Sequence, residues 1–69
     1  MIKPRDMWAV VSPDGEIELL QHKRGDAVMD FVELNAGYLV ASAGYKTAWN
    51  LTKKEGYRCV KVRVTAEEI

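Results

Sequence analysis

The segment Ser12-Pro13-Asp14-Gly15 constrains the fold more than any other part of the chain, because each of its residues favours a tight turn. Proline sets φ at the second turn position, aspartate can bond back to its own backbone, and glycine accepts positive φ. An apolar run precedes the turn, and Glu16-Ile17-Glu18-Leu19 follows with the alternation of a half-buried strand. The sequence therefore predicts an antiparallel hairpin, with strands at roughly 7–12 and 16–22.

A third strand is predicted over 57–64, where polar and apolar residues alternate strictly. One face carries Val60, Val62 and Val64, and the other carries Lys61 and Arg63. Such a strand has one wet side. Because Glu16 and Glu18 would lie on the polar face of the second strand, charge complementarity favours placing the second and third strands side by side.

One helix is predicted over 26–36. Arg24-Gly25-Asp26 interrupts the strand pattern, and the Asp26 carboxylate is a candidate N-cap. Val28, Phe31, Val32 and Leu34 follow at near-helical spacing. The helix is expected to end at Asn35-Ala36-Gly37, since glycine is common just past a helix.

The stretch 38–43 fits either a short strand or the beginning of a second helix. In the helical alternative, Ser42 could cap a helix that runs to Glu55, and Gly56 would lie just past its end. Its inner face would carry Tyr45, Ala48, Trp49 and Thr52.

The order β-β-α-α-β predicts an α+β fold: a small three-stranded, mainly antiparallel sheet with one or two helices on one face. The chain has 69 residues, which predicts a single domain over 1–69. A chain of this size buries only about 60% of its unfolded surface, so the core is thin. Trp8, Phe31 and Trp49 are expected to be mainly core. Apolar surface should remain for a partner or for a homodimer.

No catalytic, cofactor-binding or metal-binding group is expected, and the chain is predicted not to be an enzyme. A zinc site needs three or four ligands, but His22 is the one histidine and Cys59 the one thiol. A catalytic nucleophile needs a base and an orienting group, and His22 is the one histidine that could serve Cys59. Arg58 and Lys61, close to Cys59 in the sequence, could lower its pKa. Gly44-Tyr45-Lys46-Thr47 lacks the glycine directly before lysine that a phosphate-binding loop requires.

The charge of the chain is balanced but unevenly distributed. The net charge is zero, with four basic and seven acidic residues in 1–37 and six basic and three acidic residues in 38–69. A lone cysteine allows no internal disulfide, which favours a cytoplasmic location. The N-terminal residues lead into no signal-peptide core. The longest uncharged run, 34–45, has 12 residues, fewer than the about 20 that a membrane span needs.

Several short motifs follow one another along the chain. They are Trp8-Ala9-Val10, Pro13-Asp14-Gly15, a basic pair before an alanine-containing helix, Trp49-Asn50-Leu51 and Gly56-Tyr57-Arg58-Cys59-Val60-Lys61-Val62. This series resembles small uncharacterised proteins encoded by phages and prophages of proteobacteria, from which the chain departs in its apolar stretch 34–48. The resemblance implies an accessory protein that acts inside a bacterium. Such proteins are often inhibitors of host machinery, anti-CRISPR proteins among them, and the resemblance implies no active site.

We therefore expect a non-catalytic protein that binds and inhibits or modulates a bacterial host protein. The expected partner-binding residues are Tyr38, Leu39, Tyr45, Lys46, Lys53, Lys54, Tyr57 and Arg58.

Two alternative functions would depend on charged residues in place of an apolar contact surface. A nucleic-acid-binding regulator would contact phosphates through basic residues of the C-terminal half, with Tyr45 or Tyr57 stacking on bases; the basic residues are Lys46, Lys53, Lys54, Arg58, Lys61 and Arg63. Because the chain is neutral, nucleic acid is the less favoured partner. A phosphate mimic would use the acidic residues Asp14, Glu16, Glu18, Asp26, Asp30 and Glu33.

Overall fold

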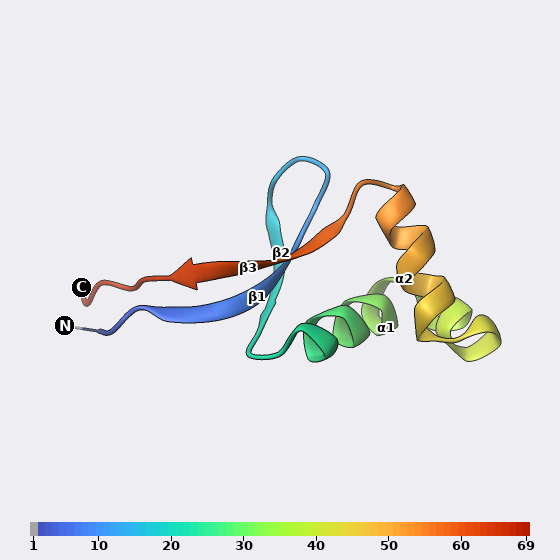
Figure 1. Ribbon diagram of the computed structural model, residues 1–69, viewed down its shortest axis with the longest axis horizontal. Helices are drawn as coiled ribbons and strands as arrows, with labels where there is room; N and C mark the ends of the chain where they lie inside the picture. The colour runs from blue at the N-terminus through green and yellow to red at the C-terminus, as the bar shows by residue number, and fades with distance from the viewer. Residues whose placement is uncertain (1) are drawn as a thin grey trace.

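The computed structural model describes residues 2–69 and confirms the predicted α+β class and its β-β-α-α-β order. The elements are β1 (Arg5–Val11), β2 (Ile17–Gln21), α1 (Arg24–Ala43), α2 (Tyr45–Lys54) and β3 (Arg58–Val64). Figure 1 shows that the paired strands β1 and β3 extend from the middle of the molecule to the two termini, whereas the helices lie together at the opposite end. Along the long axis of the molecule, a two-stranded arm formed by β1 and β3 therefore lies at one end, and a helical hairpin formed by α1 and α2 lies at the other.

The sheet has the order β2-β1-β3, and both strand pairs are antiparallel. The prediction that the second and third strands are adjacent is wrong, since β1 lies between them. Arg63 instead lies opposite Asp6 of β1, and its Nε donates to Oδ1 at 3.2 Å. The central position suits β1 because Ala9, Val10 and Val11 are all buried. Cross-strand charge pairs contribute only about 0.2–1 kcal/mol each and do not outweigh that burial.

The predicted turn between β1 and β2 is confirmed by its hydrogen bonds. The backbone N–H of Gly15 donates to the carbonyl of Ser12 at 2.9 Å, and that of Ser12 donates to the carbonyl of Glu16 at 2.8 Å. The Ser12 hydroxyl accepts from the N–H of Glu16 at 3.1 Å. A register shift between Val10 and Val11 marks a bulge just before the turn, and bulges increase strand twist.

The first helix begins earlier than predicted. Lys23 occupies the N-cap position of α1 and makes no side-chain cap bond, so the predicted cap at Asp26 is wrong. Asp26 lies inside the first turn, where a negative charge is favoured by the helix dipole. A carboxylate is stabilised by the helix dipole at any position of the first turn, so Asp26 indicated the start of the helix only to within a few residues.

The predicted helix end at 35–37 is a break from which the helix resumes. Ala36 has φ −148° and ψ 40°, which is not helical, and the residues after it continue as α1 to Ala43. The stretch 38–43 is therefore helical. Ser42 does not cap the next helix, because its hydroxyl donates to the Leu39 carbonyl at 3.3 Å and Gly44 occupies the N-cap of α2. Within residues 2–69, no helix is long and apolar enough to cross a membrane.

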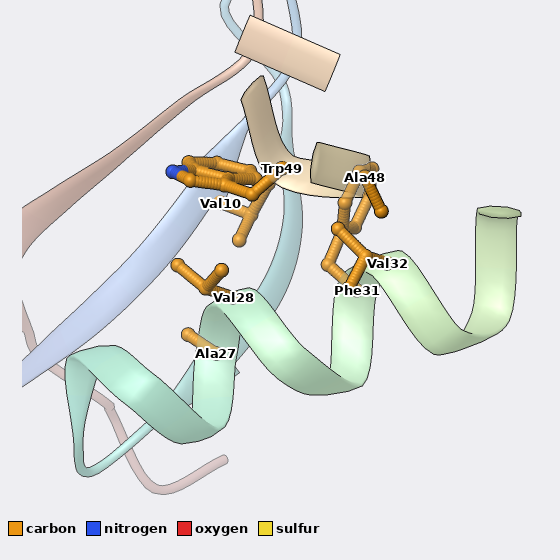
Figure 2. Packing of buried hydrophobic residues seen from close by; sticks show 7 residues of the cluster. All are labelled: Val10, Ala27, Val28, Phe31, Val32, Ala48 and Trp49. Atoms are coloured by element: carbon orange, nitrogen blue, oxygen red, sulfur yellow. The ribbon is translucent and has the colours of Figure 1, made fainter. Parts of the chain in front are cut away.

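The core joins the sheet and both helices at one point (Figure 2). Its buried members come from β1, α1 and α2, and they are Val10, Ala27, Val28, Phe31, Val32, Ala48 and Trp49. Trp8, Leu19 and Cys59 of the sheet pack against this cluster while only partly buried. The predicted core positions Phe31 and Trp49 are confirmed as buried, and Trp8 lies at the margin of the core.

Candidate protein-binding groove

A groove of about 530 Å³ lies between the second half of α1 and the facing side of α2. Apolar side chains provide much of its lining, and Tyr57 contributes from the segment after α2. The apolar lining residues are Phe31, Ala36, Leu39, Ala48 and Leu51. We call this hollow the helix-end groove, because most of its lining comes from α1 and α2. These helices lie at the end of the molecule away from the arm formed by β1 and β3 (Figure 1).

The break in α1 lies in the wall of the helix-end groove. Ala36, the residue with non-helical φ and ψ, lines the hollow, as does the preceding Asn35. Asn35 Nδ2 donates to the Phe31 carbonyl at 2.9 Å, which provides a side-chain partner for the backbone beside the break. A small residue at the point where the helix changes direction leaves volume that a larger side chain would occupy.

The polar side chains of the groove are largely engaged with their own helices. The Thr52 hydroxyl donates to the Ala48 carbonyl at 2.8 Å, and Asn35 donates as described above. Lys54 and Glu55 are exposed at the rim. The groove therefore offers a partner an apolar floor with charged groups at its edge, which is the usual composition of a specific protein contact.

Four of the eight predicted partner-binding residues meet in this groove: Tyr38, Leu39, Lys54 and Tyr57. Tyr38 is 81% exposed, whereas Leu39 and Tyr57 are half-buried and also pack against the core. The other four, Tyr45, Lys46, Lys53 and Arg58, are outside the lining.

Tyr45 stabilises the packing of α2 on α1. It packs against the core, and its hydroxyl donates to the Glu33 carboxylate. This hydrogen bond to a carboxylate, together with desolvation, raises the pKa of Tyr45 above its ordinary value. Tyr45 of α2 therefore forms a contact with α1, through Glu33.

Sequence reasoning missed Leu51, which lines the groove and is 42% exposed. The signal was present, because Leu51 is a large apolar residue that lies off the predicted inner face of α2. Asn35 and Ala36 were also missed, since they were interpreted only as the end of a helix.

The one histidine and the one cysteine of the chain lie beside and within different strands of the sheet, respectively. His22 follows β2 and Cys59 lies in β3, at opposite edges of a sheet with β1 between them. Cys59 is half-buried, and burial raises its pKa, against a smaller opposing effect of the Arg24 guanidinium. The expected lowering of this pKa by Arg58 and Lys61 is therefore not found. Among residues 2–69, no group of three or more His, Cys, Asp or Glu side chains is placed to hold a metal ion.

A raised pKa predicts slow alkylation of Cys59. Since only the thiolate reacts, the pH at half-maximal rate with iodoacetamide should lie higher in the folded chain than in the urea-unfolded chain. Rates measured from pH 7 to 11 by mass spectrometry would test this, with N-acetylcysteine as the free-thiol control. A half-rate pH below that of the unfolded chain would show an activated thiol and contradict the burial described here.

Several of the charged residues behind the two alternative functions differ in orientation or already have partners. Arg58 and Lys61 are three positions apart in β3 and so point to opposite faces of the sheet, and Arg63 is paired with Asp6. In the acidic set, Asp30 accepts from Gln21 Nε2 at 2.6 Å and Glu33 accepts from Tyr45. Arg63, Asp30 and Glu33 are therefore already engaged within the chain.

Comparison with known proteins adds no assignment to this site. No protein-family model, no curated protein and no solved structure matches the chain. The interpretation of the helix-end groove therefore rests on its own residues.

Proposed function

We propose that this chain is a non-catalytic protein of the phage accessory type, which binds a bacterial host protein in the cytoplasm and inhibits or modulates it. The observation that carries the proposal is the helix-end groove, where Tyr38 is 81% exposed beside an apolar hollow. Buried aromatic anchors and the pockets they fill supply most of the energy of protein interfaces. The motif series described above supports the phage type, and anti-CRISPR inhibition is one form that the activity would take.

The occupant of the groove would be an apolar side chain of the partner, with an acidic group nearby. A volume of about 530 Å³ lies within the range of roughly 300–1,000 Å³ that is typical of ligand pockets. The apolar floor favours an aliphatic or aromatic side chain, because burying it removes surface of both partners from water. Lys54 at the rim would then pair with a carboxylate of the partner.

Tyr38 is suited to contribute to such an interface. Its ring is large and is fixed by only two side-chain torsions, so ordering it on binding costs little entropy. It lies two residues after the break at Ala36, on the part of α1 that borders the groove. The structure therefore presents an aromatic side chain at the edge of an apolar hollow, which a partner would cover.

The proposal is tested by a matched pair of substitutions, Leu51→Arg in the groove and Met29→Arg outside it. Both residues lie in helices and both are 42% exposed, so the two changes place the same charge at equally exposed positions. The tagged wild-type chain should recover one dominant host protein from a bacterial lysate. Leu51→Arg should weaken that binding at least about 30-fold, which corresponds to a hot-spot loss of about 2 kcal/mol.

Met29→Arg should bind as tightly as the wild type, measured by titration of the purified partner. Circular dichroism would establish that both variants are folded. Equal binding by Leu51→Arg and the wild type would contradict the groove as the contact. A folded wild-type chain that recovers no specific protein would contradict the proposed function as a whole.

A further inference from the structure

The sheet has two open edges, and they differ in how well they are protected from a further strand. An edge strand has backbone N–H and C=O groups without partners, and short strands and bulges are usual means of preventing unwanted pairing. β2, at one edge, has five residues, and its pairing with β1 shifts in register between Val10 and Val11. β3, at the other edge, has seven residues and pairs with β1 in unbroken register from Arg58 to Val64. β3 therefore presents the longer and more regular edge.

The distal part of β3 belongs to a sheet of only two strands. β2 pairs with β1 from Trp8 to Val11, so residues 5–7 of β1 pair only with residues 62–64 of β3 within the described range 2–69. Figure 1 shows this pair as an arm that extends away from the helices. A two-stranded ribbon is marginally stable in water, and a third strand stabilises it. A strand added along β3 would supply that third strand.

The side chains of β3 indicate which charge such a strand should have. β3 contains three basic residues and no acidic residue, and the basic residues are all exposed: Arg58, Lys61 and Arg63. Arg63 pairs with Asp6 at 3.2 Å, whereas Arg58 and Lys61 have no ion-pair partner among residues 2–69. Opposite charges on neighbouring strands are stabilising and like charges are destabilising. An acidic strand is therefore favoured, whereas β3 of a second copy would bring the same three basic residues to the new strand pair.

Strand alternation predicts where the acidic and apolar side chains of the added strand would lie. Cys59 packs against the core, so Lys61 and Arg63 share its face, on the helix side of the sheet. The other face carries the half-buried valines of β3: Val60, Val62 and Val64. An acidic side chain would lie beside Lys61, and an aliphatic side chain beside the valines would complete their burial. The fitting segment is thus about seven residues long and alternates acidic and aliphatic residues.

We propose that the free edge of β3 binds an acidic, extended segment of a partner protein as a fourth strand of the sheet. In strand addition, main-chain hydrogen bonds provide affinity and alternate side chains provide specificity. A nucleic-acid strand has the required charge but lacks the alternating N–H and C=O groups that pair with a strand edge. No residue of β3 lines the helix-end groove, so this edge is a separate contact surface that can bind whether or not the groove does.

Two synthetic peptides test the charge preference of the edge on the full chain. One is a fluorescein-labelled nine-residue peptide of alternating glutamate and valine, and in the other lysine replaces every glutamate. In fluorescence anisotropy titrations, the glutamate peptide should bind at least about 10-fold more tightly than the lysine peptide. Equal affinities, or no binding of the glutamate peptide up to about 1 mM, would overturn the proposal. So would tighter binding of a nine-nucleotide single-stranded DNA than of the glutamate peptide.

A matched pair of variants locates the contact on β3. Lys61→Glu replaces an attractive cross-strand pair by a repulsive one and should weaken binding of the glutamate peptide at least about 5-fold. Lys46→Glu makes the same change of net charge at an exposed position of α2 and should bind like the wild type. Circular dichroism would establish that both variants are folded. Equal binding by Lys61→Glu and the wild type would place the contact elsewhere and contradict the proposal.

Amide hydrogen exchange distinguishes strand addition from a contact made by charge alone. An added strand would accept hydrogen bonds from the N–H groups of alternate β3 residues. Saturating glutamate peptide should therefore slow the exchange of these amides at least about 10-fold, measured by NMR, and leave the amides of β2 unchanged. A peptide that binds without slowing exchange in β3 would overturn strand addition.

Discussion

Replacing Trp49 by alanine is expected to lower the free energy of unfolding by about 3–5 kcal/mol, as for other buried aromatic residues. Trp49 is 6% exposed and packs with residues of β1 and α1 at the one point where all layers meet (Figure 2). A domain of 69 residues has a total stability of about 3–10 kcal/mol. The Trp49→Ala variant should therefore be largely unfolded at 37 °C, as measured by urea denaturation followed by circular dichroism.

Two further variants give this prediction its control. Tyr38→Ala removes an aromatic ring that is 81% exposed and should change stability by no more than about 0.5 kcal/mol. Trp49→Phe should destabilise far less than Trp49→Ala, because Nε1 of Trp49 is buried without a hydrogen-bond partner among residues 2–69. Equal urea midpoints for Trp49→Ala and the wild type would contradict the core described here.

Gly44→Ala is expected to destabilise the chain by about 1–3 kcal/mol. Gly44 joins α1 to α2 with φ 88° and ψ 168°, a region that residues other than glycine hardly populate. A side chain there would force the backbone to another conformation and change the angle between the two helices. The helix-end groove, which lies between them, should lose its shape along with the stability.

The matched control is Gly37→Ala, in the same helical hairpin. Gly37 has no positive φ, and a Cβ built on it meets no atom within 4 Å. Alanine should therefore leave stability unchanged or raise it by up to about 1 kcal/mol. Thermal unfolding of both variants measures the difference. The interpretation of Gly44 would be wrong if the two substitutions had the same effect.

Local chemistry determined the elements that the sequence predicted well. The turn at 12–15 and the alternation of 57–64 depend on residues adjacent in the chain, and both were located to within a few residues. The strand order was not predictable in this way. It depends on which strand is apolar enough to be central, and the charges of Glu16 and Glu18 pointed to the wrong neighbour.

The break in α1 shows a second limit of sequence reasoning. Asn35-Ala36-Gly37 has the composition of a helix end, and the backbone does leave helical geometry at Ala36. Whether a helix then stops or resumes depends on what the following residues can pack against. Here the Leu39 and Val40 side chains pack against the core, which supports continuation of the helix.

Four of the eleven residues that line the groove were predicted as partner-binding residues, for a physical reason. Aromatic and basic residue types are visible in the sequence, so Tyr38, Tyr57 and Lys54 were found. The groove itself arises from the angle between two helices, which no local pattern specifies, and so Leu51 was missed.

Site-specific photo-crosslinking tests most directly whether the helix-end groove is the recognition surface. Benzoylphenylalanine would replace Tyr38 in one variant and Met29, which is exposed outside the groove, in another. After irradiation in bacterial cells, we expect the Tyr38 position to yield one dominant cross-linked host protein and the Met29 position to yield little or none of it. Equal cross-linking at both positions, or a host adduct from Met29 alone, would contradict the account.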